Sequence, residues 1–535
     1  MTSDRMRWLL LAVAALALVL HSLAYNFVTD DAYISFVYSR NLAEHGQLTF
    51  NLGQHVEGYT NFLWTLVLGL LMLPGIPPEL SSRVLGTGCA LATLYVVFRM
   101  VERALGRKTP WAALPALLLA CSSGFACWSS GGLETQLFVL LVAVAVDAVV
   151  AAEDVAGERA LRRGGVALAL AAMTRPEGLL ITAALGVVRI VCNVLARRRV
   201  IGRDELIALA WFAGIWAPWF AWRWWYYGYF FPNTYYVKAT GPWQPPALAH
   251  EMWKSGAYYL WTWLVQTKLL YALPVAIVGL VTAPPRTPRF ALALACAVLA
   301  AAYLPYAASV GGDFMGLHRF IMPMFVVGAI AVVLGLEWLV ARLPADSRNS
   351  IAIGASIAVV VGFAITQVML TYKSLQWGNF ANDRGIDTPA FLIVYTEDRA
   401  AVGRALAPCL HDDDFSIVGG AGAQPYFGRM RAIDVFGLVS DKIAHEAPRT
   451  KARAGHTKWG SPDQLAAYDP TFVFSCYSID PKPDPRNWQC GDRGYWLGRG
   501  YEQVTIKVPE LQQSGQYYTF LAKKTRDFQC PNRVR

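Results

Sequence analysis

Two adjacent carboxylates follow the first long apolar segment of the chain. Asp30 and Asp31 stand a few residues after the run that ends near residue 25. One of them is sufficient to cap the helix that the next residues predict. A carboxylate can also take the proton from a hydroxyl group that acts as a nucleophile, and two carboxylates so close together disfavour double ionisation. We therefore expect one of the pair to act as a general base, and the other to hold an acceptor or a divalent cation.

Three basic residues elsewhere in the chain complement these carboxylates. Arg175 and Arg319 stand near the ends of long apolar runs, and Lys238 stands in the loop that follows the run 206–222. Cations lower the barrier of a reaction whose leaving group gains negative charge, and the fork of Arg suits phosphate. The alternatives are that Arg175 forms ion pairs with Glu134 and Glu177, and that the other two are surface charges.

The elements that position these residues must be membrane helices. Of the 535 residues, 55% are hydrophobic and only 16% are charged, whereas soluble domains carry about 25% charged residues. This composition excludes disordered, fibrous and disulfide-scaffold proteins, and it indicates an α-helical polytopic membrane protein.

Eleven apolar runs are long enough to cross a bilayer core, which takes about 20 residues per helix. They occupy residues 7–25, 80–101, 111–127, 134–152, 163–178, 179–196, 206–222, 260–283, 289–308, 319–341 and 350–370. The first run lacks a small-residue cleavage site, so we expect a retained helix rather than a signal peptide. Residues 31–45 repeat apolar side chains at helical spacing, which predicts an amphipathic helix on the membrane surface. The shorter apolar run 60–73 predicts a re-entrant or interfacial helix.

Lys and Arg residues give the orientation, because cytoplasmic loops carry an excess of them. With eleven spans, all the basic clusters of the membrane region fall on one side. They are Arg5 and Arg7, then 103–108, 159–163, 197–203, 286–289 and 342–348. The N-terminus is therefore expected in the cytoplasm and the C-terminal region outside. The net charge of +10 then reflects topology, and no nucleic-acid partner is expected.

Residues 371–535 contain no run of spanning length and predict a soluble extracytoplasmic α/β domain, separate from the membrane domain of residues 1–370. Strand-like runs occupy 415–418, 431–435, 471–476, 502–508 and 517–522, and a helix is expected near 397–406. The string Gly419-Gly420-Ala421-Gly422 follows the first strand, but it lacks the full frame of a dinucleotide loop.

Four cysteines, Cys409, Cys476, Cys490 and Cys530, lie in this domain. An even number of cysteines in an oxidising compartment favours disulfides, and no C-x-x-C spacing supports a zinc site. Of the three pairings, we favour Cys409–Cys530 and Cys476–Cys490.

The segment after the first span resembles a known family. The run DDAYISFVYSRNLAEHGQLTFNLGQHVEGYTNFLW, residues 30–64, combines a carboxylate pair, an interfacial helix, an asparagine–glycine turn and a second interfacial helix. This pattern is similar to the GT-C superfamily, membrane glycosyltransferases that use polyprenyl-phosphate sugars. Within that superfamily it resembles the branch of the mycobacterial terminal arabinofuranosyltransferases. Residues 130–135, 174–178, 231–238 and 311–320 also follow the general pattern of the branch, and all four lie on the outer side of the predicted topology.

The resemblance implies a GT-C fold with about eleven transmembrane helices in the plasma membrane of a bacterium. It also implies inverting transfer of a sugar, here arabinofuranose, from a polyprenyl-phosphate donor to a hydroxyl of a cell-envelope glycan or glycoprotein. Asp30 or Asp31 would be the base, and Arg175, Lys238 and Arg319 would bind the donor phosphate. The residues that it places at the substrates are Tyr33, Arg40, Asn41, Glu57, Tyr59, Asn61, Glu134, Glu177, Asn233, Asp313 and His318.

Two alternatives stay open. The first is the same chemistry with another sugar, mannose-like, or with a protein acceptor such as pilin. The second is a transporter or flippase of lipid-linked saccharides. Transporters place polar groups near the bilayer midplane, whereas the charged candidates here lie at the outer ends of spans. Lys268 is the exception.

Overall fold

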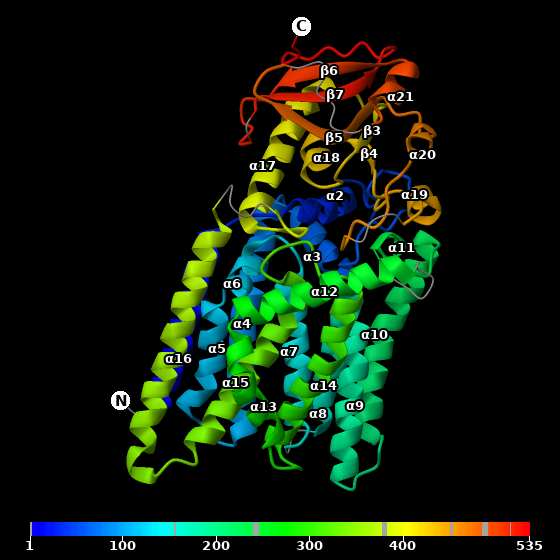
Figure 1. The fold of residues 1–535 in the computed structure, drawn as a ribbon. Helices are drawn as coiled ribbons and strands as arrows, with labels where there is room; N and C mark the ends of the chain where they lie inside the picture. The colour runs from blue at the N-terminus through cyan, green and yellow to red at the C-terminus, as the bar shows by residue number, and fades with distance from the viewer. Residues whose placement is uncertain are drawn as a thin grey trace.

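The computed structural model describes residues 3–154, 157–238, 246–376, 382–449, 453–483, 491–513 and 515–534. Figure 1 shows a tall bundle of helices with the C-terminal domain seated on one end. We name that end of the helices the domain end, and the opposite end the far end. Short helices and the long helix α12 lie between the bundle and the domain.

Seven helices among the described residues are long and apolar enough to cross a membrane. They are α1 Ser3–Tyr25, α4 Pro78–Leu105, α9 Glu177–Leu195, α10 Arg203–Tyr227, α14 Pro288–Ser309, α15 Met322–Val340 (preceded by the 3₁₀ turn η2, Arg319–Ile321) and α16 Ala345–Ser374. Two bent pairs raise the number to nine. They are α5 Leu114–Cys121 (preceded by η1, Pro110–Ala113) with α6 Ser123–Ser130, and α12 Pro246–Gln266 with α13 Leu269–Val281.

The other two predicted spans coincide with α7 Thr135–Ala151 and α8 Gly157–Thr174. Each of the eleven predicted runs thus overlaps a helix or a bent pair, so the polytopic helical class is confirmed. The predicted run 163–178 continues past the end of α8 into the start of α9. The number of crossings stays a prediction. The predicted domain boundary after residue 370 also stays one, and α16 continues past it to Ser374.

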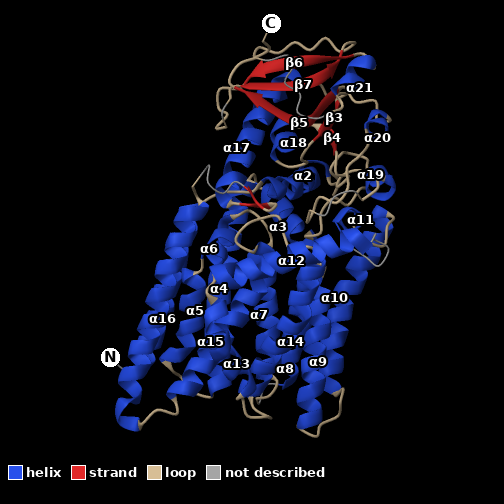
Figure 2. Ribbon diagram, viewed as in Figure 1, coloured by secondary structure: helices blue, strands red, loops and turns tan. Residues whose placement is uncertain are grey.

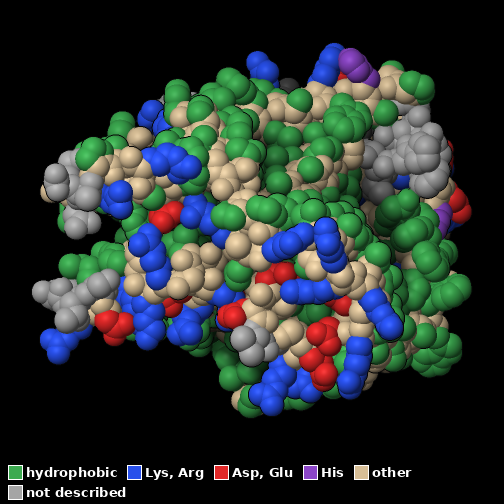
Figure 3. All heavy atoms as spheres, turned by 90° about the horizontal axis from the view of Figure 1, so that it is seen from below, with side chains coloured by type: hydrophobic (Ala, Val, Ile, Leu, Met, Phe, Trp, Pro, Cys, Tyr) green, Lys and Arg blue, Asp and Glu red, His purple; other side chains and the backbone are tan. Residues whose placement is uncertain are grey.

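Many basic side chains lie at the far end of the bundle. Figure 3, seen from the far end, shows Lys and Arg side chains gathered on that face. Several of them pair with buried carboxylates: Arg103 and Arg163 with Asp147, and Arg107 and Arg289 with Glu337. Basic residues of the kind on which the predicted orientation rests therefore gather at the far end of the folded chain.

The helix α2, Asp30–His45, corrects one prediction. It ends at Gly46, whose φ of 67° suits glycine, but it does not lie on an open membrane surface. Most of its residues are buried, because α3, Phe62–Met72, packs on one side of it and the C-terminal domain covers the other. Arg40, for example, donates to the Tyr426 carbonyl of that domain at 2.7 Å.

The C-terminal domain is α/β, as predicted. Its main sheet has five strands, and Figure 2 shows the sheet in red at the end of the molecule away from the bundle. The sheet order is β4-β3-β5-β7-β6, with β3 Phe415–Val418, β4 Arg431–Asp434, β5 Phe472–Asp480, β6 Tyr501–Lys507 and β7 Tyr517–Lys523. Strand β3 is parallel to β4 and β5, and β7 is antiparallel to β5 and β6.

Helices and short strands complete this domain. They are β1 Asn382–Asp383, β2 Ile386–Asp387, α17 Pro389–Leu406, η3 Ala407–Cys409, α18 Ala423–Gly428, α19 Asp441–Glu446, α20 Pro462–Ala466 and α21 Arg493–Gly498. The predicted helix near 397–406 is the second half of α17. Each of the five predicted strand runs overlaps one strand of the sheet.

The disulfide Cys409–Cys530 is confirmed, with 5.2 Å between the two Cα atoms. It ties the segment after α17 to the end of the chain. Cys476 is also disulfide-bonded, and its predicted partner, Cys490, lies outside the described residues.

Removing this crosslink is expected to loosen the domain. The bond closes a loop over a sequence separation of 121 residues, so the Cys409→Ser/Cys530→Ser double variant should lose about 2–4 kcal/mol of domain stability, because its unfolded state is less constrained. Hydrogen exchange of the β5–β7 amides in the full chain measures this. We expect their exchange to become at least about tenfold faster. Cys121→Ser, which changes a free cysteine of α5, is the control, and equal exchange in the two variants would contradict the prediction.

Candidate active site

A cavity of about 580 Å³ lies between the domain end of the bundle and the C-terminal domain. Segments far apart in the sequence line it, from α2 to residues 454–455 of the C-terminal domain. The predicted site residues that it brings together are Asp31, Tyr59, Asn61, Glu134, Arg175, Glu177, Lys238, Asp313 and Arg319. This convergence makes the cavity the candidate active site.

Asp31 is the carboxylate of the pair that faces the cavity. Among the described residues, no hydrogen bond or ion pair engages its side chain. Burial raises the pKa of Asp31, and the positive charges of Lys238 and Arg319 act against that rise. A carboxylate with a raised pKa and free oxygen atoms is suited to accept a proton from a bound hydroxyl group.

Asp30 is used differently. Its Oδ1 accepts a hydrogen bond from the backbone N–H of Ala423 in the C-terminal domain, at 2.8 Å. A Cβ atom on Gly422 would lie 2.2 Å from the Asp30 carbonyl oxygen, so glycine at this position permits the close approach of the loop to α2. Burial raises the pKa of Asp30 to about 6, although this hydrogen bond and the charge of Arg399 lower it. The two aspartates therefore have different roles: the carboxylate of Asp31 is free in the cavity, and the carboxylate of Asp30 holds the C-terminal domain.

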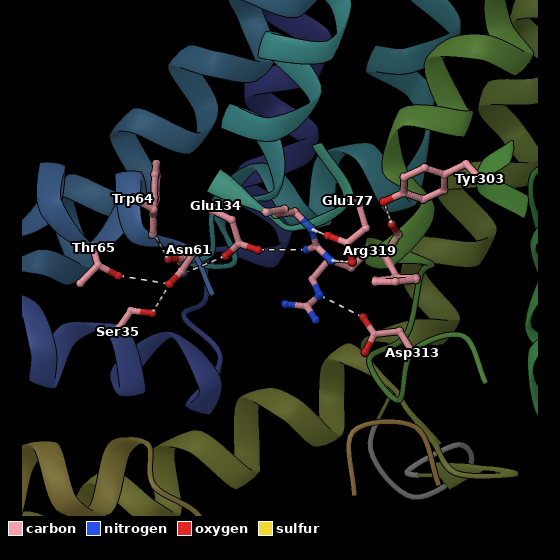
Figure 4. Close-up of polar contacts among 12 residues, drawn as sticks. Ser35, Asn61, Trp64, Thr65, Glu134, Glu177, Tyr303, Asp313 and Arg319 are labelled. Atoms are coloured by element: carbon pink, nitrogen blue, oxygen red, sulfur yellow. Dashed lines mark hydrogen bonds and ion pairs between the residues drawn. The ribbon is translucent and has the colours of Figure 1, made fainter. Parts of the chain in front are cut away.

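Arg319 presents a partly free guanidinium group to the cavity. Its Nε donates to Asp313 Oδ2 at 3.0 Å (Figure 4), while its two Nη atoms form no hydrogen bond among the described residues. Arg319 lines the cavity. The preceding loop reaches this position through Gly311 and Gly312, with φ of 85° and 74°. A Cβ atom on Gly312 would lie 2.5 Å from the Tyr259 ring, so this loop requires glycine for both reasons.

His318 lies just behind Arg319, outside the lining of the cavity. It is buried, and its Nε2 is 3.1 Å from the Thr262 hydroxyl of α12. Burial lowers the pKa of His318 to about 3, so its imidazole is neutral at physiological pH. We assign it a role in holding the loop on α12.

Arg175 forms a buried ion-pair cluster with two carboxylates, Glu134 and Glu177, both of which are labelled in Figure 4. Its Nη1 is 2.9 Å from Glu134 Oε1, and its Nε is 3.3 Å from Glu177 Oε2. Asn61 donates to the other oxygen of Glu134 at 2.9 Å. Pro176 separates α8 from α9 and places Arg175 in the break. The ion-pairing alternative for Arg175 is thus the arrangement found, and its charge is offset by two partners.

Lys238 is the second available cation. It is the last residue of α11, Asn233–Lys238, and it lines the cavity with no hydrogen bond or ion pair among the described residues. The helix is fixed at its start, where the Asn233 side chain donates to the carbonyls of Gly437 and Leu438 at 2.7 and 2.9 Å. Asn233 therefore positions Lys238 and contacts the protein rather than the cavity.

The remaining predicted residues also contact protein. Glu57 forms a buried ion pair with Arg223, at 2.9 Å between Oε1 and Nε. Asn41 donates to the carbonyls of Thr49 and Phe50, both at 2.9 Å. The rings of Tyr33 and Tyr426 lie 5.2 Å apart, and Arg40 bonds the same residue of α18. These four predicted residues hold the interfacial segments and the C-terminal domain in place.

Other cavity residues were not predicted from the sequence. Tyr306 of α14 lines the cavity, with its hydroxyl 3.4 Å from Glu177 Oε1. Leu438, Ala454 and Gly455 come from the C-terminal domain. An aromatic residue in an apolar span and small residues in a distant loop carry no local signal, because only tertiary packing brings them to the cavity.

The structure contains no group of three or more His, Cys, Asp or Glu side chains, among the residues it describes, that is arranged to hold a metal ion. Asp31 is the one member of the predicted pair whose oxygen atoms face the cavity. Metal dependence stays a prediction.

The bundle, the interfacial helices after the first span and the cavity beneath an α/β domain together define a membrane protein of the GT-C fold class, as predicted. Two solved structures of ArnT from Cupriavidus metallidurans are similar to this chain over 97% of its length and 98% of theirs. The one bound to undecaprenyl phosphate aligns with a TM-score of 0.57 at 15% identity, and the apo one with 0.52 at 13%. No family model and no curated protein sequence matches the chain. The likeness at this level of identity concerns the fold, and the arabinofuranosyltransferase branch stays a prediction.

Proposed function

We propose that the protein is a glycosyltransferase that moves a sugar from a polyprenyl-phosphate donor to a hydroxyl of a cell-envelope acceptor. The observation that carries this proposal is the free carboxylate of Asp31, which faces the same cavity as Lys238 and the free Nη atoms of Arg319. The ArnT structure of the same fold holds undecaprenyl phosphate, a lipid phosphate of the kind that two free cations would bind.

The reaction follows from these groups. The acceptor oxygen attacks C1 of the sugar while Asp31 takes its proton. The bond between C1 and the phosphate oxygen breaks, and the prenyl phosphate leaves with the bonding electron pair, so the configuration at C1 inverts. Lys238 and Arg319 stabilise the charge that develops on the phosphate. Arg175 keeps Glu134 and Glu177 at the cavity wall, where they can accept hydrogen bonds from sugar hydroxyls.

An apolar side of the cavity suits the prenyl chain. Leu179 and Leu180 of α9 and Val310 after α14 line it, and Leu179 is exposed on the outside of the bundle. The chain of the donor would therefore leave the cavity beside α9 and enter the bilayer, while its phosphate stays near Arg319.

The sugar and the acceptor are the finer part of the proposal. Arabinofuranose is favoured because residues 30–64 resemble the arabinofuranosyltransferase branch. A mannose-like sugar or a protein acceptor requires the same groups and is the alternative. The cavity lies at the domain end rather than at mid-depth of the bundle, which favours a transferase over a flippase.

We place the protein in the plasma membrane of a bacterium, with the far end in the cytoplasm and the C-terminal domain outside. The Lys and Arg side chains at the far end support this orientation. The disulfide Cys409–Cys530 supports an oxidising compartment for the domain.

The test is a transfer assay with the purified chain in nanodiscs. The donors are synthetic prenyl-phosphoryl arabinofuranose and prenyl-phosphoryl mannose, the acceptor is an arabinoside, and mass spectrometry detects the product. An arm with EDTA tests the predicted divalent cation. Arabinosylated product supports the full proposal, and prenyl-phosphate release without acceptor product supports the donor alone. The proposal would be overturned if no lipid-phosphate sugar gave either a transferred product or release of prenyl phosphate.

The rate of sugar transfer is expected to fall as the pH is lowered, and the fall should begin at a higher pH than an ordinary Asp carboxyl would give. A raised pKa of Asp31 means that the base becomes protonated, and the rate falls, above the value of about 3.9 found for a free Asp. This fall in rate is not explained by acid unfolding through Asp30 or Asp31, because their raised pKa values stabilise the fold at low pH. A group with a raised folded pKa, such as Asp30 at about 6, stabilises the fold at low pH and loses that contribution as pH rises through 6.

A profile of kcat/KM between pH 3 and 8 checks this prediction. The acid limb should disappear from the residual activity of Asp31→Asn. An acid limb of the wild type centred at or below about 3.9, the value of a free Asp, would contradict it.

A further inference from the structure

A second cavity, of about 370 Å³, lies deeper in the bundle between α5, the turn from α12 to α13, α15 and α16. It shares no lining residue with the candidate active site. We name it the bundle pocket. Its walls include Leu118, Trp263, Lys268, Val332, Val359 and Thr366.

The bundle pocket is polar at one end and apolar at the other. Three of the lining segments place a polar residue toward the domain end and apolar residues deeper in the bundle, whereas α15 contributes only apolar residues and a glycine. On α16, which rises toward the domain end, Thr366 follows Val359 and Gly362. On the descending α13, Ala272 follows Lys268, and on the ascending α5, Leu118 precedes Ser122. A lipid that stands upright in the bilayer has the same polarity.

The polar end contains hydrogen-bond donors without partners. Ser122 and Trp263 are 3% and 4% exposed, and neither Ser122 Oγ nor Trp263 Nε1 has a hydrogen-bond partner among the described residues. Leaving such groups buried and unpaired destabilises the fold, so native proteins usually satisfy them. A ligand with acceptor oxygens would satisfy both.

Lys268 adds a positive charge at the same end. It stands in the turn where α12 and α13 meet at 86°, in a left-handed conformation with φ of 58°. Its side chain forms no ion pair or hydrogen bond among the described residues. A cation between apolar spans is costly unless a partner or water compensates it, and it marks a functional site by default.

We propose that the bundle pocket binds one anionic glycerophospholipid from the leaflet on the domain side. The lipid phosphate pairs with Lys268, its ester carbonyls accept from Trp263 Nε1–H and Ser122 Oγ–H, and one acyl chain extends toward Val332 and Val359. A prenyl phosphate offers the phosphate but no ester carbonyl, so it matches the two neutral donors less well. The site is therefore distinct from the donor site, and it does not depend on the proposed reaction.

The occupant would brace the helix that carries the active-site loop. Thr262 and Tyr259, on α12 just before the turn, contact His318 and Gly312 of that loop. A lipid held at Lys268 thus lies within a few helical turns of the residues that position Arg319.

Native mass spectrometry of the full chain tests the proposal. The detergent-purified protein is delipidated, and equal amounts of dioleoyl phosphatidylglycerol, dioleoylglycerol or undecaprenyl phosphate are added. We expect one phosphatidylglycerol adduct that is at least tenfold more abundant than the dioleoylglycerol adduct, and at least tenfold less abundant in Lys268→Gln. Lys373→Gln, which removes an exposed charge at the domain end of α16, should leave the adduct unchanged.

A second pair of variants fills the pocket without removing charge. A Cβ atom at Gly362 or at Gly354 meets nothing within 4 Å, and only Gly362 lines the bundle pocket. Gly362→Leu should abolish the adduct, while Gly354→Leu, on the same helix, should keep it. Each of three results would overturn the proposal. The first is an equal phosphatidylglycerol adduct in Lys268→Gln and wild type, and the second is an equal adduct in the two glycine variants. The third is displacement of bound phosphatidylglycerol by an equal amount of undecaprenyl phosphate.

Discussion

Asp31→Asn is expected to lower the turnover number of sugar transfer by roughly 10²–10⁴-fold, the range that general-base catalysis contributes. An amide of the same shape cannot take the proton from the acceptor hydroxyl. Binding of the prenyl-phosphate donor should change little, because Lys238 and Arg319 are intact. Turnover in nanodiscs with saturating donor measures the first effect, and titration of the donor measures the second.

The neighbouring aspartate provides a matched control. In Asp30→Asn the amide oxygen can still accept the hydrogen bond from Ala423 N–H that Asp30 Oδ1 accepts now, at 2.8 Å, so the variant should stay within about tenfold of the wild type. If Asp30→Asn is inactive and Asp31→Asn is active, the base is Asp30. If both variants keep full activity, neither aspartate is the base.

The second large effect is expected for Arg319→Gln, which should lower turnover by about 10²–10³-fold, as the loss of one oxyanion-stabilising donor does in other enzymes. The free Nη atoms of Arg319 would otherwise meet the phosphate as it gains charge. The product undecaprenyl phosphate should therefore also inhibit the variant less strongly than the wild type. Turnover and product-inhibition constants measure both consequences.

A structural effect must be separated from this one, because the variant leaves the carboxylate of Asp313 without its ion pair at 3.0 Å. The double variant Arg319→Gln/Asp313→Asn removes that unpaired charge and should regain thermal stability but not turnover. Lys254→Gln, which removes a cation that pairs with Glu251 on the exposed face of α12 at 2.8 Å, should keep both. Recovery of turnover in the double variant would show that Arg319 acts only through the fold.

The sequence was sufficient for features that depend on local pattern. Apolar runs and turn residues predicted the helices and the five strands of the C-terminal domain, because helix and strand periodicities are properties of neighbouring residues. The even number of cysteines in one domain favoured disulfides, and the pairing Cys409–Cys530 was chosen among three possibilities. Polar residues at the ends of apolar runs also predicted most of the charged lining of the cavity, since helix ends on the same side of a membrane must lie near one another.

Tertiary structure decided which of these residues are available for chemistry. Successive residues of a helix point about 100° apart, so Asp30 and Asp31 necessarily face different surroundings, but the sequence does not say what surrounds each one. Asp30 meets Ala423, which is 393 positions away, and this contact turns it toward the C-terminal domain and leaves Asp31 in the cavity. In the same way, the positive charge of Arg175 is offset by Glu134, which lies 41 positions away, whereas the Nη atoms of Arg319 have no hydrogen-bond partner among the described residues. Contacts over such separations depend on how the whole chain packs, and no local pattern encodes them.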